Sequence, residues 1–382
     1  MLLGIASSLS AFGMASVIPA LPLMTRELQV DYATVQFVVT AYLLGLGLFQ
    51  PIQGLLADRF GRRPVLLGGY SLFLFASALA GLASQLWTLV IARFLQAMGI
   101  SVATVVTRAI VRDSFEPGPA ASALSFITAV MGLAPVIAPV VGGLAAESLG
   151  WRGIFSIHAL VAAMLLIVMV WKLKETRPAG TTSMTLTELM RAAVVLLRDR
   201  AFIGHSLTYS SVSAAGFIFI TVGAALYEKL YGFSSADFGA LWSGLAISYV
   251  AGAAAAGHLT RRIGPKRASN VGMAFNVGAT AMFVLAAFSD APSLIWLSGS
   301  LALLMIANGI LSPLALSGAV DDHPQLAGVA AGLSSSIAML LSMLSAGLTG
   351  WLYDGTARYC AVLMAVAAVV CWGSARLAHR SS

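Results

Sequence analysis

Charged residues are scarce in this chain of 382 residues, since only 10% are Asp, Glu, Lys or Arg while 59% are hydrophobic. A soluble domain usually carries about 25% charged residues. A chain of this composition has too few polar groups to cover a surface in contact with water. The composition therefore excludes an ordinary soluble protein and predicts that lipid surrounds most of the chain.

Cysteine and the usual motifs of catalysis are also lacking. The two cysteines, Cys360 and Cys371, both lie in the last apolar stretch and predict neither a disulfide framework nor a metal site. The sequence contains no ATP-binding loop of the Gly-x-x-x-x-Gly-Lys-Ser/Thr type, and no set of nucleophile and base. We therefore expect no enzymatic activity, no cofactor and no bound metal.

The apolar stretches lack the alternation of apolar and polar residues that marks membrane-spanning strands. Only helices and closed barrels satisfy every backbone group in lipid, and barrel strands alternate over segments of about 10 residues. Helices of roughly 20 apolar residues are required to cross a bilayer. The sequence predicts twelve, near residues 2–24, 33–56, 65–83, 86–110, 121–146, 153–171, 201–226, 237–260, 267–288, 293–318, 326–352 and 357–378.

The basic residues lie mainly in every second loop between these spans. When loops are assigned alternately to two sides, one side holds 17 of the 22 basic residues, the other holds four, and Arg93 lies within a span. Because cytoplasmic loops are enriched in Lys and Arg, we expect the first side and both termini to face the cytoplasm, in a multi-pass protein of the cell inner (plasma) membrane. The net charge of +7 is not gathered on one helix face, which argues against nucleic-acid binding.

One polar stretch, 172–200, divides the spans into two sets of six. We expect domains at 1–171 and 201–382, joined by a cytoplasmic linker. Thr185 and Glu188 have the spacing of a capping box, followed by apolar residues on one helical face. The linker is therefore predicted to contain a short amphipathic helix at the membrane surface.

The loops after the second and eighth spans repeat each other. Residues 54–64 read GLLADRFGRRP and residues 257–267 read GHLTRRIGPKR, with two glycines, a leucine and an arginine at one constant offset. Six spans duplicated as a parallel repeat is the arrangement of transporters whose halves rock around a central site. The sequence thus predicts an all-α membrane protein of two six-helix repeats.

The first of these loops resembles the signature of the major facilitator superfamily, and residues 89–99 resemble its fourth-span motif. Residues 19–22, 108–113 and 134–143 are similar to the bicyclomycin-resistance (Bcr/CflA) branch of its drug-proton antiporters. The resemblance implies a monomeric alternating-access transporter that exports drug-like small molecules in exchange for protons. A dedicated metabolite or siderophore exporter and a non-transporting membrane sensor are the alternatives.

The resemblance also implies roles for individual residues. Asp58 would close the inner gate by pairing with basic side chains and with the N-terminus of span eleven, while Gly54 and Gly61 permit the tight turn. The rest of the gating network would be Arg59, Arg62, Arg63, Arg112 and Asp113, and the exporter-type motif of span five, expected to bend that helix, would be Pro135, Pro139, Gly142 and Gly143.

Arg93 is the one charged residue in the interior of a span, and Gln96 lies one helical turn further on. Such a charge usually faces a cavity or a partner, so we expect Arg93 and Gln96 to serve the cavity or coupling; snorkelling to the outer interface is the alternative. The branch commonly has an acid where this chain has Ala15, which leaves His158 and His205 as titratable candidates. Polar residues able to line a cavity are Gln36, Tyr42, Gln50, Tyr209, Ser213, Asn276, Asn308 and Ser312.

Overall fold

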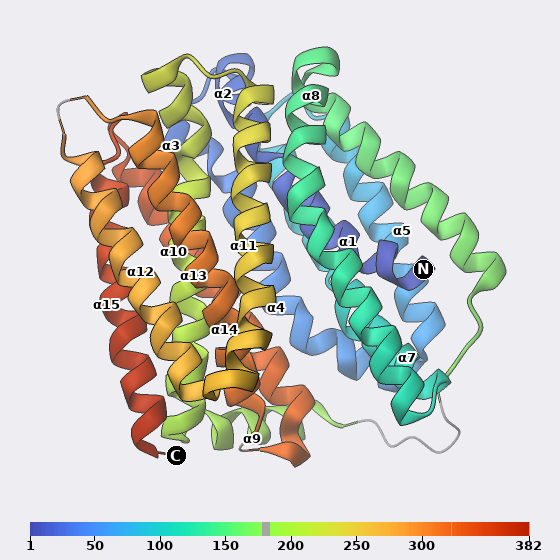
Figure 1. The fold of residues 1–382 in the computed structure, drawn as a ribbon. Helices are drawn as coiled ribbons and strands as arrows, with labels where there is room; N and C mark the ends of the chain where they lie inside the picture. The colour runs from blue at the N-terminus through green and yellow to red at the C-terminus, as the bar shows by residue number, and fades with distance from the viewer. Residues whose placement is uncertain (178–183, 290, 322, 382) are drawn as a thin grey trace.

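The computed structural model describes residues 1–177, 184–289, 291–321 and 323–381, and every regular element in these residues is helical (Figure 1). The elements of the first half are α1 (Leu2–Ala15), the short helix η1 (Ile18–Ala20), α2 (Leu21–Leu28), α3 (Tyr32–Val35), α4 (Phe37–Phe60), α5 (Arg62–Gly81), α6 (Leu86–Ile100), α7 (Val102–Ser114) and α8 (Pro117–Lys172).

A short helix, α9 (Leu186–Leu196), precedes the second half, and it begins at a capping box formed by Thr185 and Glu188. The elements of the second half are α10 (Arg200–Tyr231), α11 (Ser235–Ile263), α12 (Pro265–Ala287), α13 (Leu294–Asp321), η2 (Pro324–Leu326), α14 (Ala327–Leu352) and α15 (Arg358–Ser381). Figure 1 shows the helices of the two halves side by side, with most of them running between the same two ends of the molecule.

The described residues contain eleven helices that are long and apolar enough to cross a membrane, one of which covers Gly118–Lys172. A helix of 55 residues would be about 80 Å long at 1.5 Å per residue, far beyond the roughly 30 Å of a bilayer core. Gly150 interrupts it with non-helical backbone angles, φ 71° and ψ 170°. The two predicted spans on either side of Gly150 are therefore both present, which gives twelve crossings.

The first predicted span differs from the structure because it is broken. Helix α1 ends at Ala15, and a short helix η1 follows before α2 begins. Pro19 has no backbone N–H to donate to the carbonyl of Ala15, so the α-helix cannot continue regularly through this point. Ser16 lies in the break, and its side chain donates to the carbonyl of Phe12 at 2.8 Å.

The two halves meet along two pairs of helices, α4 with α14 and α8 with α11. Very small residues allow these approaches: a methyl group at Gly239 of α11 would lie 2.3 Å from the carbonyl oxygen of Pro139 in α8. Gly142, in the same segment of α8, is equally tight against the break in span one, because a methyl group there would lie 1.9 Å from the carbonyl oxygen of Ser16. Pro139 and Gly142 thus lie where α8 packs against both its own half and the opposite half.

Candidate functional site

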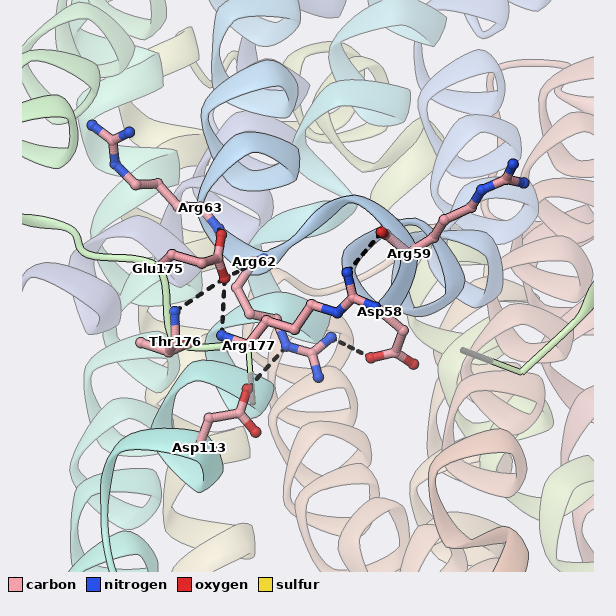
Figure 2. Close-up of polar contacts among 8 residues, drawn as sticks. All are labelled: Asp58, Arg59, Arg62, Arg63, Asp113, Glu175, Thr176 and Arg177. Carbon is pink, nitrogen blue, oxygen red and sulfur yellow. Dashed lines mark hydrogen bonds and ion pairs between the residues drawn. The ribbon is translucent and has the colours of Figure 1, made fainter. Parts of the chain in front are cut away.

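Arg62 lies at the centre of a charged cluster where α4 ends and α5 begins, at what we call the Arg62 end of the molecule (Figure 2). Its guanidinium binds the carboxylate of Asp58 one turn earlier in the chain. Its Nε also donates to Oδ2 of Asp113, on α7, at 3.0 Å. Because the Arg62 side chain is only 9% exposed, these two carboxylates largely replace water around its charge.

Gly61 makes the turn between the two helices possible. Its φ of 103° is a conformation that residues with a Cβ rarely adopt. A methyl group at this position would also lie 2.6 Å from Oε2 of Glu175. The predicted requirement for glycine at position 61 therefore has both a conformational and a steric cause. Position 54 has ordinary space instead, because a methyl group there would lie 3.7 Å from Val105.

Glu175 completes the cluster from the far end of α8, and no local pattern in the sequence indicated it. Its carboxylate accepts hydrogen bonds from the backbone N–H groups of Arg62 at 2.9 Å and Arg63 at 3.1 Å. These are N–H groups of the first turn of α5, which have no partner inside the helix. Partial burial alone would raise the pKa of Glu175, but its backbone donors together hold that pKa below its ordinary value.

Two arginines fasten the start of the linker to the same turn. Arg63 donates from Nε to the carbonyl of Leu173 at 2.8 Å and from Nη2 to the carbonyl of Val170 at 2.9 Å. Arg177 donates to the carbonyl of Arg59 at 2.9 Å (Figure 2). The cluster thus joins α4, α5, α7 and the segment after α8 into one unit within the first half.

Two of the arginines expected in the gating network lie outside it in this conformation. The exposed side chain of Arg59 stacks on Phe60, at 5.3 Å from the ring centre, and contributes only its carbonyl to the cluster. The side chain of Arg112 is exposed and makes no ion pair with the described residues. Arg112 directly precedes Asp113 on α7, and consecutive residues of a helix point about 100° apart, so only one of them can face Arg62.

Asp58 likewise contacts its own half rather than span eleven. Its ion pair is with Arg62, and no hydrogen bond among the described residues joins it to the start of α14. Where the structure describes hydrogen bonds from side chains of one half to the other half, they lie instead at the opposite end, which we call the Arg26 end. There Arg26 binds Glu228 at 2.5 Å, and Glu147 accepts from the backbone N–H of Ala236 at 2.9 Å.

The Arg26 end is closed further by two side chains near the start of α4. Tyr32 and Gln36 both donate to the carbonyl of Thr221 on α10, at 2.9 Å and 2.8 Å. None of the residues of this closure except Gln36 was singled out from the sequence. Ion pairs such as Arg26–Glu228 join residues about 200 positions apart, so no sequence spacing could indicate them.

Arg93 is fully buried inside the first half, and this placement excludes snorkelling to an interface. Its guanidinium donates to the carbonyls of Gly13 at 3.0 Å and Val38 at 3.2 Å, and lies 4.0 Å from the centre of the Tyr42 ring. The carbonyl of Gly13 belongs to the last turn of α1, where backbone oxygens lack helical partners and the helix dipole favours a cation. The break in span one therefore creates the site that holds Arg93.

Gln96 extends this polar core. It accepts from Nη1 of Arg93 at 2.9 Å and donates to the hydroxyl of Ser77 at 2.7 Å. Both residues are 0% exposed in this conformation, and their role in the cavity or in coupling stays a prediction. Among the described residues no Asp or Glu is buried, so carbonyl and aromatic groups stabilise the positive charge of Arg93.

His158 lies in the same half against the break in span one. One ring nitrogen is 2.8 Å from the hydroxyl of Ser16, and the other, Nδ1, has no partner among the described residues. The rings of Phe12, Phe73 and Phe155 surround it at 5.7 to 6.1 Å. His205 is placed differently, packed closely against Gly318 of α13 in the second half.

The remaining polar candidates divide between structural bonds and unpartnered atoms. Tyr42 donates to the carbonyl of Ser10 at 2.8 Å, and the hydroxyl of Ser213 lies 3.1 Å from that of Ser342. The side-chain oxygens of Gln50, Asn276 and Asn308 are buried without a partner in the described residues. Buried polar groups of this kind are costly unless water or a ligand satisfies them.

Comparisons with known proteins agree with this fold. The family model of the Major Facilitator Superfamily matches residues 3–346. Multidrug resistance protein D of Escherichia coli is 30% identical over 93% of this chain and 90% of its own length, and a bicyclomycin resistance protein homolog of Haemophilus influenzae is 24% identical over 88% and 84%. A crystal structure of a peptide transporter in complex with sulfate superposes with a TM-score of 0.81 at 17% identity, covering 100% of this chain and 94% of the other.

The solved structure supports the fold alone at that level of identity, whereas the sequence relatives confirm the resemblance drawn from the motifs. The family match extends from α1 into α14 and so covers spans of both halves. This multi-pass membrane protein belongs to the Major Facilitator Superfamily.

Proposed function

We propose that this chain is a drug exporter of the cell inner membrane that works as a monomer by alternating access and exchanges its substrate for protons. The relatives named for multidrug, bicyclomycin and chloramphenicol resistance support the substrate class. The bias of 17 basic residues to four supports a cytoplasmic location for the Arg62 end and both termini. The Arg26 end then faces outward.

The observation that carries this proposal is the unequal contact between the halves. Four side chains, Arg26, Tyr32, Gln36 and Glu147, bind the second half at the Arg26 end. At the Arg62 end, the ion pairs made by the described residues, such as those of Arg62 with Asp58 and Asp113, lie within one half. This distribution is that of a transporter closed outward and ready to receive a substrate from the cytoplasm. Residues 1–171 and 201–382 would move as the two rigid bodies, tethered by residues 172–200.

The buried polar groups support a neutral hydrogen-bonding substrate. Asn308 approaches Gly216 of α10, with its amide nitrogen 3.8 Å from where a Cβ would lie, and its side-chain oxygen is unpartnered. No buried carboxylate among the described residues could attract a lone cation. Amide and hydroxyl groups select by hydrogen bonding and shape instead.

Proton exchange rests on the resemblance to the drug-proton antiporters, because position 15 holds alanine. The titratable group that the structure offers in its place is His158, which touches the break in span one through Ser16. Movement of this break during the cycle would admit water to the imidazole, whose ordinary pKa near 6.5 suits proton exchange at physiological pH.

The proposal is tested by expressing the chain in a strain that lacks its own drug exporters. Compared with the same strain without the chain, we expect cells that express it to accumulate less bicyclomycin or chloramphenicol, and a protonophore to remove this difference. Cells with the Asp58→Asn variant at an equal membrane level should accumulate as much drug as the strain without the chain. Substrate-independent signalling, with no compound accumulating less, would favour a sensor over an exporter.

A further inference from the structure

Helices α8 and α11 pack in antiparallel register at the Arg26 end. A methyl group at Gly143 of α8 would lie 2.4 Å from the carbonyl oxygen of Ser235, and one at Gly239 of α11 would lie 2.3 Å from that of Pro139. A step of four residues toward the N-terminus of α8, from Gly143 to Pro139, therefore corresponds to a step of four residues toward the C-terminus of α11, from Ser235 to Gly239. Since both helices rise by 1.5 Å per residue, this correspondence can be followed to the other end.

The register aligns two opposite charges at the Arg62 end. Counting equal steps from Pro139 back to Pro117 and from Gly239 on to Arg261 brings Arg261 level with the first residue of α8. Glu116, the N-cap residue of α8, is then level with Arg262. Both arginines belong to the last turn of α11, which ends at Ile263.

These three side chains are unengaged in the present conformation. Glu116, Arg261 and Arg262 are all exposed, and none of them takes part in an ion pair within the described residues. Glu116 does not use its side chain to cap α8 either. They lie on facing helices whose tight contacts are at the opposite end, so a rocking motion that opens the Arg26 end brings them toward each other.

The other pair of facing helices, α4 and α14, also packs in antiparallel register, but in this pair the acid lies at the end of a helix and not at its start. Gln36 lies against Gly350 and Gly47 against Leu340. The same register continued from Gly47 brings Asp58 level with the first turn of α14. Here the acid lies near the end of α4, and the start of α14 that it would face has no cationic side chain. In the repeated loop, Arg261 occupies the position equivalent to Asp58. The change from an acid at position 58 to arginine at the equivalent position 261 is explained if the group that faces Arg261 is an acid.

We propose that Glu116 and the pair Arg261 and Arg262 form a second inner latch, which closes the Arg62 end when the Arg26 end opens. The inference rests on the alternating access proposed above but needs no particular substrate. The carboxylate also gains from its position at the N-terminus of α8, and the arginines from theirs at the C-terminus of α11. The latch would be made only in the outward-open state.

Disulfide crosslinking tests the latch without any transport measurement. In a background with Cys360→Ser and Cys371→Ser, the pair Glu116→Cys and Arg261→Cys should crosslink on mild oxidation. The control pair, Asp58→Cys and Arg261→Cys, lies at the same end but on helices that do not face each other in this register. We expect a crosslink yield several-fold higher for the first pair.

The crosslinked protein should also be open at the other end. Thr221→Cys, buried in the present closure, would report this as faster labelling by a membrane-impermeant maleimide after crosslinking, reversed by reduction. Equal crosslinking of the two pairs, or crosslinking with no gain in labelling, would overturn the latch. Failure of drug transport in a protein that still crosslinks and opens would instead count against the proposed function alone.

Charge exchange provides an independent test of the pairing. Glu116→Arg and the double variant Arg261→Glu with Arg262→Glu should each reduce labelling of Thr221→Cys, because like charges resist inner closure. The three substitutions together should restore it. If the variant with all three substitutions is labelled as slowly as the slower of the two variants from which it is combined, the charges do not face each other.

Discussion

Glu175 caps α5 through the backbone N–H of Arg62, although 113 positions separate the two residues. The same carboxylate also accepts from the N–H of Arg63. It therefore fixes the segment after α8 against the turn between α4 and α5. This contact makes the charged turn at the Arg62 end part of a larger unit rather than an isolated loop.

Glu175→Gln should weaken this attachment in a pH-dependent manner. The pKa of Glu175 is held below its ordinary value of 4.5 in the folded protein. Its stabilising contribution is therefore complete above that value and is lost as the pH falls through the lowered pKa. Helix capping contributes about 1 kcal/mol, and the exposure of Glu175 reduces this figure.

The measurement is thermal unfolding in detergent of Glu175→Gln and of the wild type at neutral pH and near pH 3. The difference in midpoint should be present at neutral pH and shrink at the lower pH. Glu116→Gln is a suitable control, because the side chain of Glu116 makes no capping hydrogen bond to α8. A difference that grows on acidification would show that Glu175 does not act as an ionised cap.

The sequence predicted the parts of this protein that depend on local pattern. Span positions follow from apolar length, and the turn at Gly61 follows from the repeated motif, so both were predicted correctly. The break after Ala15 was missed because a proline within an apolar stretch permits a kink as well as a break. Glu175 and the Arg26–Glu228 pair were missed because their partners are brought together only by packing between distant helices.

Arg93 illustrates a different limit. Its position within a span predicted an important polar environment, but not that backbone carbonyls would provide it. The carbonyl of Gly13 is available because α1 ends two residues later. Since the break was not predicted, neither was the burial of the guanidinium.

Asp58→Asn should abolish most transport while leaving the protein folded and inserted. The substitution removes charge with little change in volume. It loses the ion pair with Arg62 and the attraction of the carboxylate to the start of α14 when the inner end closes. Efflux at matched membrane level is the measurement, with size-exclusion behaviour as the folding control. Wild-type efflux by this variant would make Asp58 an ordinary loop charge.

Glu228→Gln should favour opening of the Arg26 end. The Arg26–Glu228 pair joins the two halves, and its side chains are 62% and 37% exposed. Exposed pairs contribute up to about 1 kcal/mol, so the outward-open population should rise by no more than roughly fivefold. Labelling of Thr221→Cys by an impermeant reagent measures this shift. Asp237→Asn, at the same end but bonded within its own helix start, should have little effect; equal labelling of the two variants would contradict a latch at Glu228.

Arg93→Ala should lose transport, and Arg93→Lys should lose less. Alanine leaves the carbonyls of Gly13 and Val38 without their donor, while lysine keeps the charge but cannot reproduce the planar fork over Tyr42. The positive charge without a buried carboxylate also predicts preference for neutral or anionic compounds. Ethidium-like cations exported as fast as neutral drugs, and unaffected by Arg93→Ala, would show that this electrostatic account is wrong.

The most direct test of the central claim is transport by the purified protein in proteoliposomes with an imposed pH gradient. We expect a neutral drug to accumulate inside vesicles with an acidic lumen, and the lumen to lose protons as the drug enters. Nigericin, which collapses the gradient, should abolish both signals, and His158→Asn should uncouple them. Drug accumulation that is the same with and without the gradient, or absent in vesicles that contain folded protein, would contradict proton-coupled export.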